Sequence, residues 1–203
     1  MSSTGNLLPR RLRSAISRRT HCGVKKGGKH VEKVIRDKTV NYTAYEGGSN
    51  FLGTTTVDLP EFSFLSDSIK GAGMLGETEL PAFGQFSSMT VTLNWSTIEP
   101  AAITLMESGR KMITLRSAQQ ALDKTSGTQR FEAVKIVLGG TVKTQSLGSL
   151  EVGAATGGST EMELTYVKMS VGGKDLIEID KYNMIYKING KDQLADLRKA
   201  LGE

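Results

Sequence analysis

Side chains that support catalysis or bind metals are scarce in this sequence. Residues 37–203 contain no histidine and no cysteine, because His21, Cys22 and His30 all lie nearer the N-terminus. This absence excludes Ser–His and Cys–His nucleophilic catalysis, and most transition-metal sites, from that part of the chain. His21, Cys22 and His30 match no standard zinc spacing and lack a fourth ligand. We therefore expect no enzyme activity, no cofactor and no bound metal.

Other features are also sparse. Aromatic residues make up only 6% of the chain and hydrophobic residues 38%, which suits a β-rich protein with a modest core. A single cysteine excludes an internal disulfide framework. No apolar run approaches the roughly 20 residues of a membrane-spanning helix, and no secretory signal is visible. We expect a protein that works without a membrane and is made in a reducing compartment.

Charge is divided unevenly along the chain. Residues 1–36 hold ten Lys or Arg against one Glu, a net charge of +9, whereas residues 37–203 hold 16 basic and 20 acidic residues, a net charge of −4. The two parts are electrostatically different. Residues 1–36 are rich in Gly, Ser, Arg and Lys and have no regular periodicity. We predict a basic, disordered extension at 1–36 and one folded domain at 37–203.

The basic extension has two interpretations. Its Lys and Arg side chains can neutralise phosphates and release counterions, so a nucleic-acid-binding arm is the alternative function for the protein. No aromatic residue lies between the charges, so base stacking is not offered. The interpretation we prefer is an unstructured extension without a function of its own.

Residues 37–203 have the pattern of short strands separated by glycine-rich turns. In Ser88–Trp95, for example, apolar and polar residues alternate strictly, as in a half-buried strand. Pro100 and Gly109 delimit a short internal helix. Leucines at helical spacing predict a C-terminal helix at Lys191–Leu201, with Leu194, Leu197 and Leu201 as its docking face. About nine strands at these spacings predict an antiparallel β-sandwich or barrel.

Turn and capping residues predict four details of the chain path. Gly139–Gly140 is expected to reverse the chain after a strand. Gly172–Gly173 is expected to form a hairpin turn. The polar segment Gln119–Gln129 is expected to be a loop. Ser96 and Glu99 have the spacing of a capping box at the start of the internal helix.

The segment Ile69–Met89 does not fit the strand pattern. Its four glycines and Pro81 exclude a regular helix or a central strand. Yet it holds too many large apolar side chains for an idle solvated loop. Long loops of this kind are usually functional or docked on something. We predict an arm that docks on a neighbouring copy of the protein; the alternative is a long hairpin loop folded on its own domain.

Two segments resemble the major tail tube protein of contractile-tailed bacteriophages, a family shared with phage-tail-like bacteriocins. The first is Val57–Pro60 followed by IKGAGMLGETELPAFGQFSSMTVTLNW at 69–95, and the second is DLIEIDKYNMIYKINGKDQLADLRKALG at 175–202. The order, spacing and length of the two segments carry the resemblance. The extension before residue 37 departs from it, because such proteins usually start close to their first strand.

The resemblance implies a structural protein without catalysis. Members form a mainly β, antiparallel sandwich that contributes strands to a ring-shaped inner β-barrel, and their hexameric rings stack into a hollow tube. The implied partners are further copies of the chain, a tail sheath protein, the baseplate and a tail terminator, with no membrane. DNA, or an effector, would pass through the bore without specific binding. The implied location is a virion tail or phage-tail-like particle, after synthesis in the cytoplasm of a bacterial host.

The resemblance also implies an inter-subunit assembly loop at residues 66–86, which coincides with the predicted arm. This loop would reach the adjacent ring or subunit. Burial of its apolar side chains contributes about 25 cal/mol per Å² of surface removed from water, and this free energy is gained only if a partner covers them. The expected contact residues are Ile69, Lys70, Gly71, Gly73, Met74, Leu75, Gly76, Glu77, Leu80 and Phe83.

Two further groups of candidate residues complete the expectations. A negative body would repel phosphates and let DNA slide through a bore, so acidic residues are expected to face it. The candidates are Asp58, Glu61, Glu161 and Glu163, and alternation alone leaves open whether they face the bore or the outer surface. The C-terminal segment carries a motif formed by Asp180, Asn183, Asn189, Gly190, Asp192 and Arg198.

Overall fold

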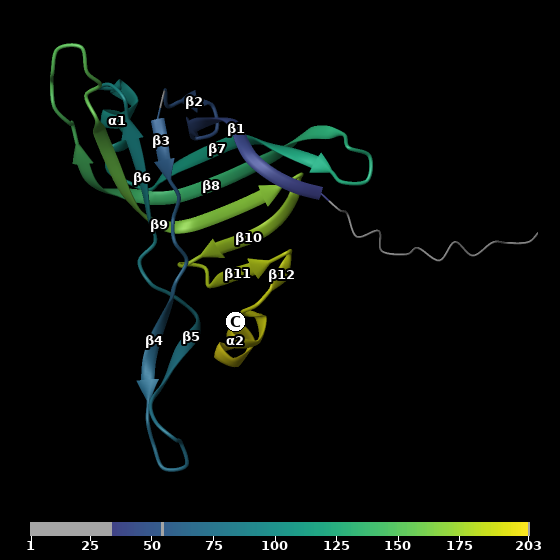
Figure 1. The fold of residues 1–203 in the computed structure, drawn as a ribbon. Coiled ribbons are helices and arrows are strands. Elements are labelled where there is room, and N and C mark those ends of the chain that lie inside the picture. The colour runs from purple at the N-terminus through teal and green to yellow at the C-terminus, as the bar shows by residue number, and fades with distance from the viewer. Residues whose placement is uncertain (1–33, 54, 203) are drawn as a thin grey trace, which may run out of the picture. The chain divides into compact units, whose positions relative to one another are not determined.

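The computed structural model describes residues 34–53 and 55–202. In this part of the chain antiparallel strands dominate, accompanied by two short helices (Figure 1). The elements are β1 (Val34–Glu46), β2 (Asn50–Phe51), β3 (Thr55–Asp58), β4 (Phe64–Ile69), β5 (Thr78–Phe86), β6 (Thr90–Trp95), α1 (Pro100–Leu105), β7 (Lys111–Asp123), β8 (Gln129–Ser146), β9 (Gly158–Val171), β10 (Lys174–Asp180), β11 (Ile185–Ile188), β12 (Lys191–Asp192) and α2 (Ala195–Leu201). The predicted mainly β, antiparallel fold with an internal and a C-terminal helix is confirmed.

Ten strands form one sheet that branches at β9. The main path runs β12-β11-β10-β9-β8-β7-β1-β2. On the side of β9 away from β8, residues 158–163 pair with β6, which pairs in turn with β3, whereas residues 166–171 pair with β10. The branch allows both parts of the sheet to contribute to a single core.

The core is formed mainly by β6, β7, β9 and α1. The alternation predicted for β6 is confirmed, because Val91, Leu93 and Trp95 are buried and the residues between them are partly exposed. Helix α1 adds Ala102 and Leu105 to the same cluster. Each large apolar side chain buried in this way contributes about 1.5–3 kcal/mol to the free energy of unfolding. The burial stabilises the side of the sheet opposite its charged outer face.

Strand β8 continues through Gly139 and Gly140, where the sequence predicted a turn, so that prediction is wrong. A Cβ atom on Gly139 would lie 2.7 Å from the sulfur of Met112, and one on Gly140 would overlap the backbone oxygen of Glu163. The register of β8 against β9 shifts between the two glycines, as at a β-bulge. Gly140 therefore allows β8 and β9 to approach closely, and Gly139 leaves room for the side chains of Met112 and Arg110, so the pair does not reverse the chain.

Strand β7 extends to Asp123, so the loop predicted at Gln119–Gln129 is wrong for its first part. Residues 119–122 pair with β8, and residues 119–123 pair with β1. The turn is confined to residues 124–128, where the amide of Thr125 donates to Asp123 Oδ1 over 2.8 Å. Partners on both sides satisfy the backbone of this polar stretch and outweigh its weak strand propensity. The hairpin turn at Gly172–Gly173 is confirmed.

The helix N-termini differ from the predictions. Glu99 is the N-cap residue of α1, and no side chain caps the helix. The predicted capping box of Ser96 and Glu99 is therefore wrong. The Glu99 carboxylate instead accepts a hydrogen bond from the Thr97 hydroxyl over 3.2 Å. Pro100 does occupy the first turn, as expected.

Helix α2 is shorter than predicted. Residues from Lys191 first pair with β11 as strand β12, so the helix starts later, and Gly202 ends it with a φ of 84° as expected. Leu194 is buried, but Leu197 and Leu201 are 39% and 60% exposed. The predicted docking face is thus wrong except at Leu194.

In the described chain, β1 begins three residues before the predicted boundary between extension and domain. Arg36 belongs to this strand, and its Nε lies 2.6 Å from a carboxylate oxygen of Glu132. The rest of the predicted extension, including His21, Cys22 and His30, lies outside the described residues.

Candidate assembly surface

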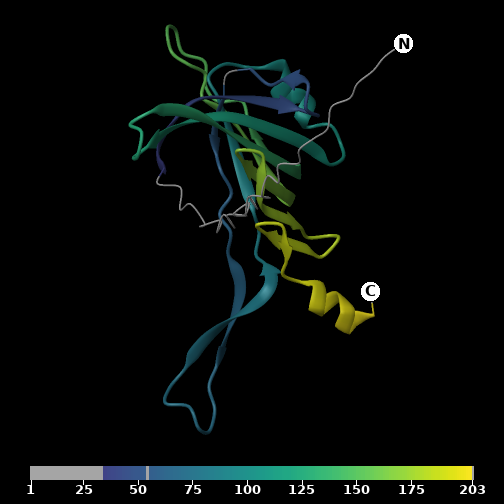
Figure 2. The same cartoon turned by 90° about the vertical axis from the view of Figure 1, so that its right-hand side faces the viewer.

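The segment predicted as a docking arm is a hairpin that projects from the main sheet (Figure 2). Strands β4 and β5 form a separate two-stranded sheet, with Ser66 opposite Pro81 and residues 70–77 at the tip. The predicted loop at 66–86 is therefore mostly strand. A two-stranded ribbon has open edges on both sides, so Pro81 interrupts no neighbouring ladder. The expectation that this segment is no central strand is confirmed.

The hairpin beyond its root is exposed. Every side chain from residue 65 to residue 83 is exposed, and Leu75 at the tip is uncovered. The large apolar side chains exposed along it are Leu65, Ile69, Met74, Leu75, Leu80 and Phe83. Apolar residues gathered in this way mark interaction sites. The alternative of a hairpin loop folded onto its own domain is contradicted.

The predicted contact residues occupy three parts of the hairpin. Lys70, Gly71, Gly73, Met74, Leu75, Gly76 and Glu77 form the tip, Ile69 ends β4, and Leu80 and Phe83 lie on β5. At the tip, Gly73 and Gly76 adopt φ values of 93° and 121°, which favour glycine. Phe83 differs from the others because it lies near the root and stacks on Phe64, with ring centroids 6.0 Å apart.

Four aromatic rings join the root of the hairpin to the body. Phe64, Phe83 and Phe86 come from β4 and β5, and Tyr186 comes from β11. The Tyr186 ring centroid lies 5.0 Å from that of Phe86, 6.0 Å from Phe83 and 6.1 Å from Phe64. Aromatic pairs contribute about 0.5–1.5 kcal/mol beyond their buried area. Sequence analysis missed Tyr186, and its only signal was its place within the C-terminal segment of the resemblance.

Gly84 is a second contact between hairpin and body. Its φ is 82°, and a Cβ atom there would lie 2.5 Å from Cδ2 of Leu194. Leu194, which precedes α2, is 4% exposed although most of its neighbours in the sequence are exposed. Glycine is therefore required at residue 84 by both backbone conformation and close packing.

Asp180 in the C-terminal motif organises the turn before β11. Its carboxylate accepts hydrogen bonds from the Asn183 side chain (2.7 Å) and from the amides of Tyr182 (3.1 Å) and Asn183 (3.2 Å). Burial raises the pKa of Asp180, but these hydrogen bonds outweigh burial and hold the pKa below its usual value. The carboxylate thus stays ionised and fixes the turn.

Asp192 and Arg198 connect α2 to the sheet. Their side chains form an ion pair, and Arg198 Nη1 donates to the backbone oxygen of Met184 over 2.7 Å. The Arg198 guanidinium is the main reason why the pKa of Asp192 lies below its usual value. Asn189 and Gly190 adopt φ values of 50° and 77° in the turn between β11 and β12. All six motif residues therefore shape the path of the C-terminal segment.

Three of the four acidic candidates share one face of the sheet. Asp58 lies opposite Thr92, and Thr92 lies opposite Glu161. Glu163 is two residues further along β9 and so points to the same side, away from the core. Glu61 is exposed in the segment between β3 and β4.

The acids on this face all have polar partners. Asn94 donates to Asp58 over 2.8 Å, and Lys143 lies 3.4 Å from Glu161. Glu163 accepts hydrogen bonds from the Ser88 hydroxyl (2.5 Å) and the Met89 amide (3.3 Å), and Lys181 lies 3.6 Å away. Burial raises the pKa of Glu163, but these three partners outweigh burial and hold the pKa below its usual value.

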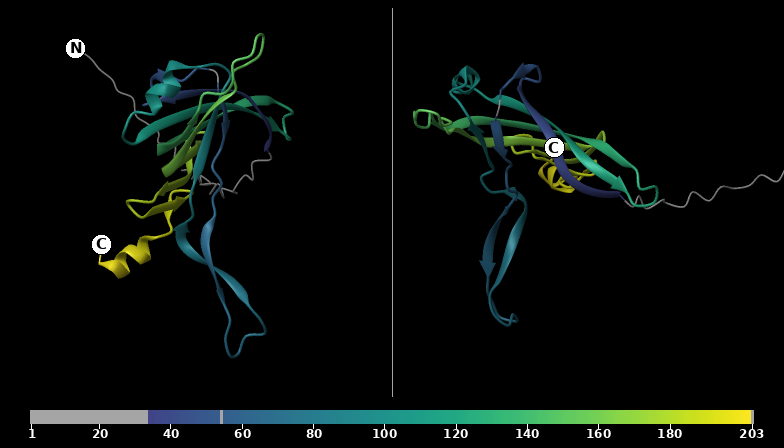
Figure 3. Two further views of the ribbon diagram at one scale, coloured as in Figure 1. Left: turned by 90° about the vertical axis from the view of Figure 1, so that its left-hand side faces the viewer. Right: turned by 45° about the horizontal axis from the view of Figure 1, so that its top comes forward.

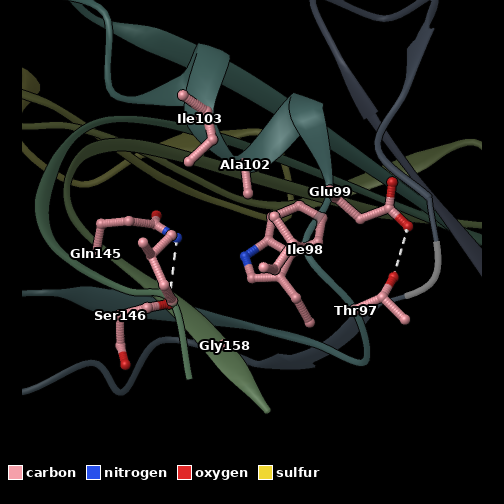
Figure 4. A pocket seen from close by; sticks show the side chains of 10 residues that line it. Thr97, Ile98, Glu99, Ala102, Ile103, Gln145, Ser146 and Gly158 are labelled. Atoms are coloured by element: carbon pink, nitrogen blue, oxygen red, sulfur yellow. Dashed lines mark hydrogen bonds between the residues drawn. The ribbon is translucent and has the colours of Figure 1, made fainter. Parts of the chain in front are cut away.

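One enclosed pocket in the described residues is too small for a ligand. Figure 4 shows a pocket between α1 and the ends of β6 and β8, lined by Ile98, Ala102 and Gln145 among others. Its volume is about 10 Å³, which is room for at most one water molecule. The part of the chain that the structure describes contains no group of three or more potential metal ligands. No helix there is long and apolar enough to cross a membrane.

An exposed apolar hairpin, fixed at its root to an antiparallel β body, defines a structural assembly protein. More specifically, the chain belongs to the phage tail tube protein FII family, whose model matches residues 36–202. The tail tube protein of Escherichia phage P2 is 29% identical over 151 residues, which cover 72% of this chain and 86% of the relative. The predicted resemblance is confirmed: this chain is a structural subunit of a phage-type tail tube.

Two solved chains from an extracellular contractile injection system are also similar. One, from the PVC sheath/tube terminator in its extended state, has a TM-score of 0.47 and 14% identity, and the match covers 67% of this chain and 97% of that chain. The other, from the PVC sheath-tube complex in its extended state, has a TM-score of 0.43 and 15% identity over 64% of this chain and 88% of that chain.

Proposed function

We propose that this chain forms hexameric rings that stack into a hollow tube for DNA or effector passage, and that it has no catalytic role. The tube would lie inside a contractile sheath, between a baseplate and a tail terminator, in a particle made in the bacterial cytoplasm. The observation that carries the proposal is the exposed apolar hairpin β4–β5. Burial of its side chains requires another molecule.

The geometry of the hairpin favours an open stack. It projects from one end of the body (Figures 1 and 2), and we propose that it contacts a different surface of the next copy. Such heterologous contacts produce rings when the rotation closes and filaments when it does not. A tube needs one heterologous contact that closes into a ring and a second that continues from ring to ring without closing.

The long edge of β1 supports the closed ring. In the described sheet β1 pairs along its length with β7, whereas on its other side β2 pairs only with Tyr45 and Glu46. Open edges of this length invite pairing with another chain. We propose that each β1 edge pairs with the neighbouring subunit, so that the ring closes into a continuous inner barrel.

The acidic face of β3, β6 and β9 is our candidate for the bore, together with exposed Glu61. Asp58, Glu161 and Glu163 lie on this face, although Lys143 and Lys181 neutralise part of their charge. A bore with a small excess of negative charge would repel phosphates and let DNA slide.

Electron microscopy of purified protein tests the proposal. We expect rings or tubes from the wild type, and folded but unassembled subunits from Gly73→Val and Met74→Glu. The valine strains a backbone with a φ of 93°, and the glutamate places a charge at an apolar tip. Met106→Glu, at an exposed methionine of similar accessibility outside the hairpin, is the control and should still assemble.

Two results would contradict the proposal. A strictly monomeric wild type at high concentration excludes a self-assembling tube subunit. Normal tubes from both hairpin variants exclude the hairpin as the joint between copies.

A further inference from the structure

We infer that the C-terminal segment, residues 180–198, is a positioning element for the assembly hairpin, and that Tyr186 and Leu194 fix the direction in which β4–β5 leaves the body. This inference rests on the proposed role of the hairpin as the joint between subunits. Figure 3 shows that the hairpin and α2 leave the sheet close together but in different directions. The segment therefore acts at the root of the hairpin and leaves the tip uncovered.

The hairpin is held only near its root. Beyond Phe64 and Gly84 its side chains are exposed, so its direction depends on a few contacts. Tyr186 packs against the rings of Phe64 and Phe86 on one side of the root. Leu194 packs over the backbone of Gly84. Both of these body residues belong to the C-terminal segment.

The polar residues of the C-terminal motif hold Leu194 in place. Asp192 accepts a hydrogen bond from the Leu194 amide over 3.0 Å and forms an ion pair with Arg198. Arg198 in turn donates to the backbone oxygen of Met184. The backbone of Leu194 is therefore held at two points, because its amide donates to Asp192 and its carbonyl oxygen accepts from the amide of Arg198.

A separate contact fixes the end of the hairpin. The ammonium group of Lys181 donates to the backbone oxygen of Ser87 over 2.8 Å, directly after β5. Lys181 follows Asp180, whose carboxylate organises the adjoining turn. Thus residues 181, 186 and 194 contact the root at successive points.

A small change at this root is amplified at the tip. Strands rise about 3.3 Å per residue, so the six residues from Gly84 to Thr78 span about 20 Å. A rotation of about 10° at the root then moves the start of the tip by about 3 Å over that length. Such a displacement is enough to misalign an apolar contact with a second copy.

The root also has room to adjust without unfolding. A hollow of about 200 Å³ lies beside Gly84 and Leu194 and is lined by Ile179, Met184 and Leu197 among others. Because this hollow adjoins the contact, a shift of the hairpin root at residue 84 need not disturb the packed core. Crowding there should redirect the hairpin more than it destabilises the core.

A double-mutant cycle tests the inference. Gly84→Ala adds a Cβ atom against Leu194, Leu194→Ala removes the opposing side chain, and the double variant removes the clash. Gly173→Ala is the matched control, because its φ of 79° resembles the 82° of Gly84 but no atom lies within 4 Å of the added Cβ. We expect Gly84→Ala to lower tube yield about tenfold, the double variant to recover part of that loss, and Gly173→Ala to have no effect on yield.

The direction of the hairpin is measured separately with spin labels. Cysteines replace Glu77 at the tip and Lys124 in the β7–β8 turn, in a Cys22→Ser background diluted with unlabelled protein. We expect Leu194→Ala to broaden or shift the distance distribution. Leu201→Ala, at the end of α2 where the side chain is 60% exposed, should leave the distribution unchanged.

The outcomes separate this inference from the proposed function. A wild type that forms neither rings nor tubes contradicts the proposed function itself. If the wild type assembles, unchanged distances in Leu194→Ala overturn the inference, even if Gly84→Ala fails to fold. Normal tube yield from a folded Gly84→Ala variant overturns it as well.

Discussion

Trp95, the only tryptophan of the chain, joins two strands through a buried polar contact. Its Nε1 donates to Oγ1 of Thr160 over 2.8 Å, and that hydroxyl donates in turn to Gln145 over 2.5 Å. Both Trp95 and Thr160 are almost fully buried. Buried donors and acceptors are costly when left without a partner, so each member of this series depends on the others.

Trp95→Phe should lower the free energy of unfolding by about 1–3 kcal/mol, because Thr160 loses a donor and the smaller ring leaves space. Urea unfolding measures the change. Tyr182→Phe, at a side chain that is 76% exposed, is the control and should leave the midpoint unchanged. An unchanged midpoint for Trp95→Phe would show that the hydrogen bond adds no stability.

Asp192 makes the free energy of unfolding depend on pH. The pKa of Asp192 is lower in the folded protein, chiefly because of Arg198, so its contribution is complete above the unfolded value of about 3.9 and is lost as pH falls toward the folded pKa. Asp192→Asn should make the fall of Tm below about pH 4 less steep.

Thermal unfolding at a series of pH values measures this slope. Asp196→Asn, at an exposed position of α2, is the control and should keep the wild-type slope. Because the pKa values of Asp180 and Glu163 are also lowered, the slope in Asp192→Asn should decrease but not vanish. Identical slopes in wild type and Asp192→Asn would exclude the contribution of this carboxylate.

At the scale of elements, the sequence predicted those strands that alternate cleanly. Strand β6 was predictable because one face is buried and the other is not. The end of β7 was not, because its strand state depends on partners distant in sequence. The turn predicted at Gly139–Gly140 was wrong for a related reason: glycine serves both tight turns and close packing, and only the positions of the neighbouring strands decide between them.

Gly140→Ala tests that explanation. The added Cβ atom would overlap the backbone oxygen of Glu163, so we expect a loss of about 1–3 kcal/mol in the free energy of unfolding. Chemical denaturation measures the loss. Gly71→Ala is the control, because no atom lies within 4 Å of its Cβ and its φ is not left-handed. Equal stability of both variants would mean that β8 and β9 adjust without strain.

At the scale of the whole molecule, the hairpin was predictable and its support was not. Glycines, proline and apolar residues in one segment indicated an arm, because this combination fits no buried element. Tyr186 gave no comparable signal, and the helical spacing that predicted Leu194 as a docking residue did not indicate what it contacts. Their contact with Gly84 and Phe86 becomes visible only in three dimensions.

The basic residues before the domain give a further prediction for the whole molecule. Because the family model matches residues 36–202, a protein starting at residue 34 should still form tubes. Any affinity of the full chain for DNA should fall steeply with salt and disappear in this shortened protein. Filter binding at several salt concentrations measures the affinity, and electron microscopy the tubes. Salt-resistant binding that survives the deletion would place the DNA contact in the domain.

A two-stranded ribbon without a core of its own is only marginally stable in water. The first contact between subunits is therefore opposed by the loss of conformational entropy as the tip becomes ordered. Each later subunit meets a tip that is already held in place. Growth should then show a lag that preformed ends abolish. Purified protein would then polymerise only after that lag, and where a preformed seed is present it would decide where each cylinder begins.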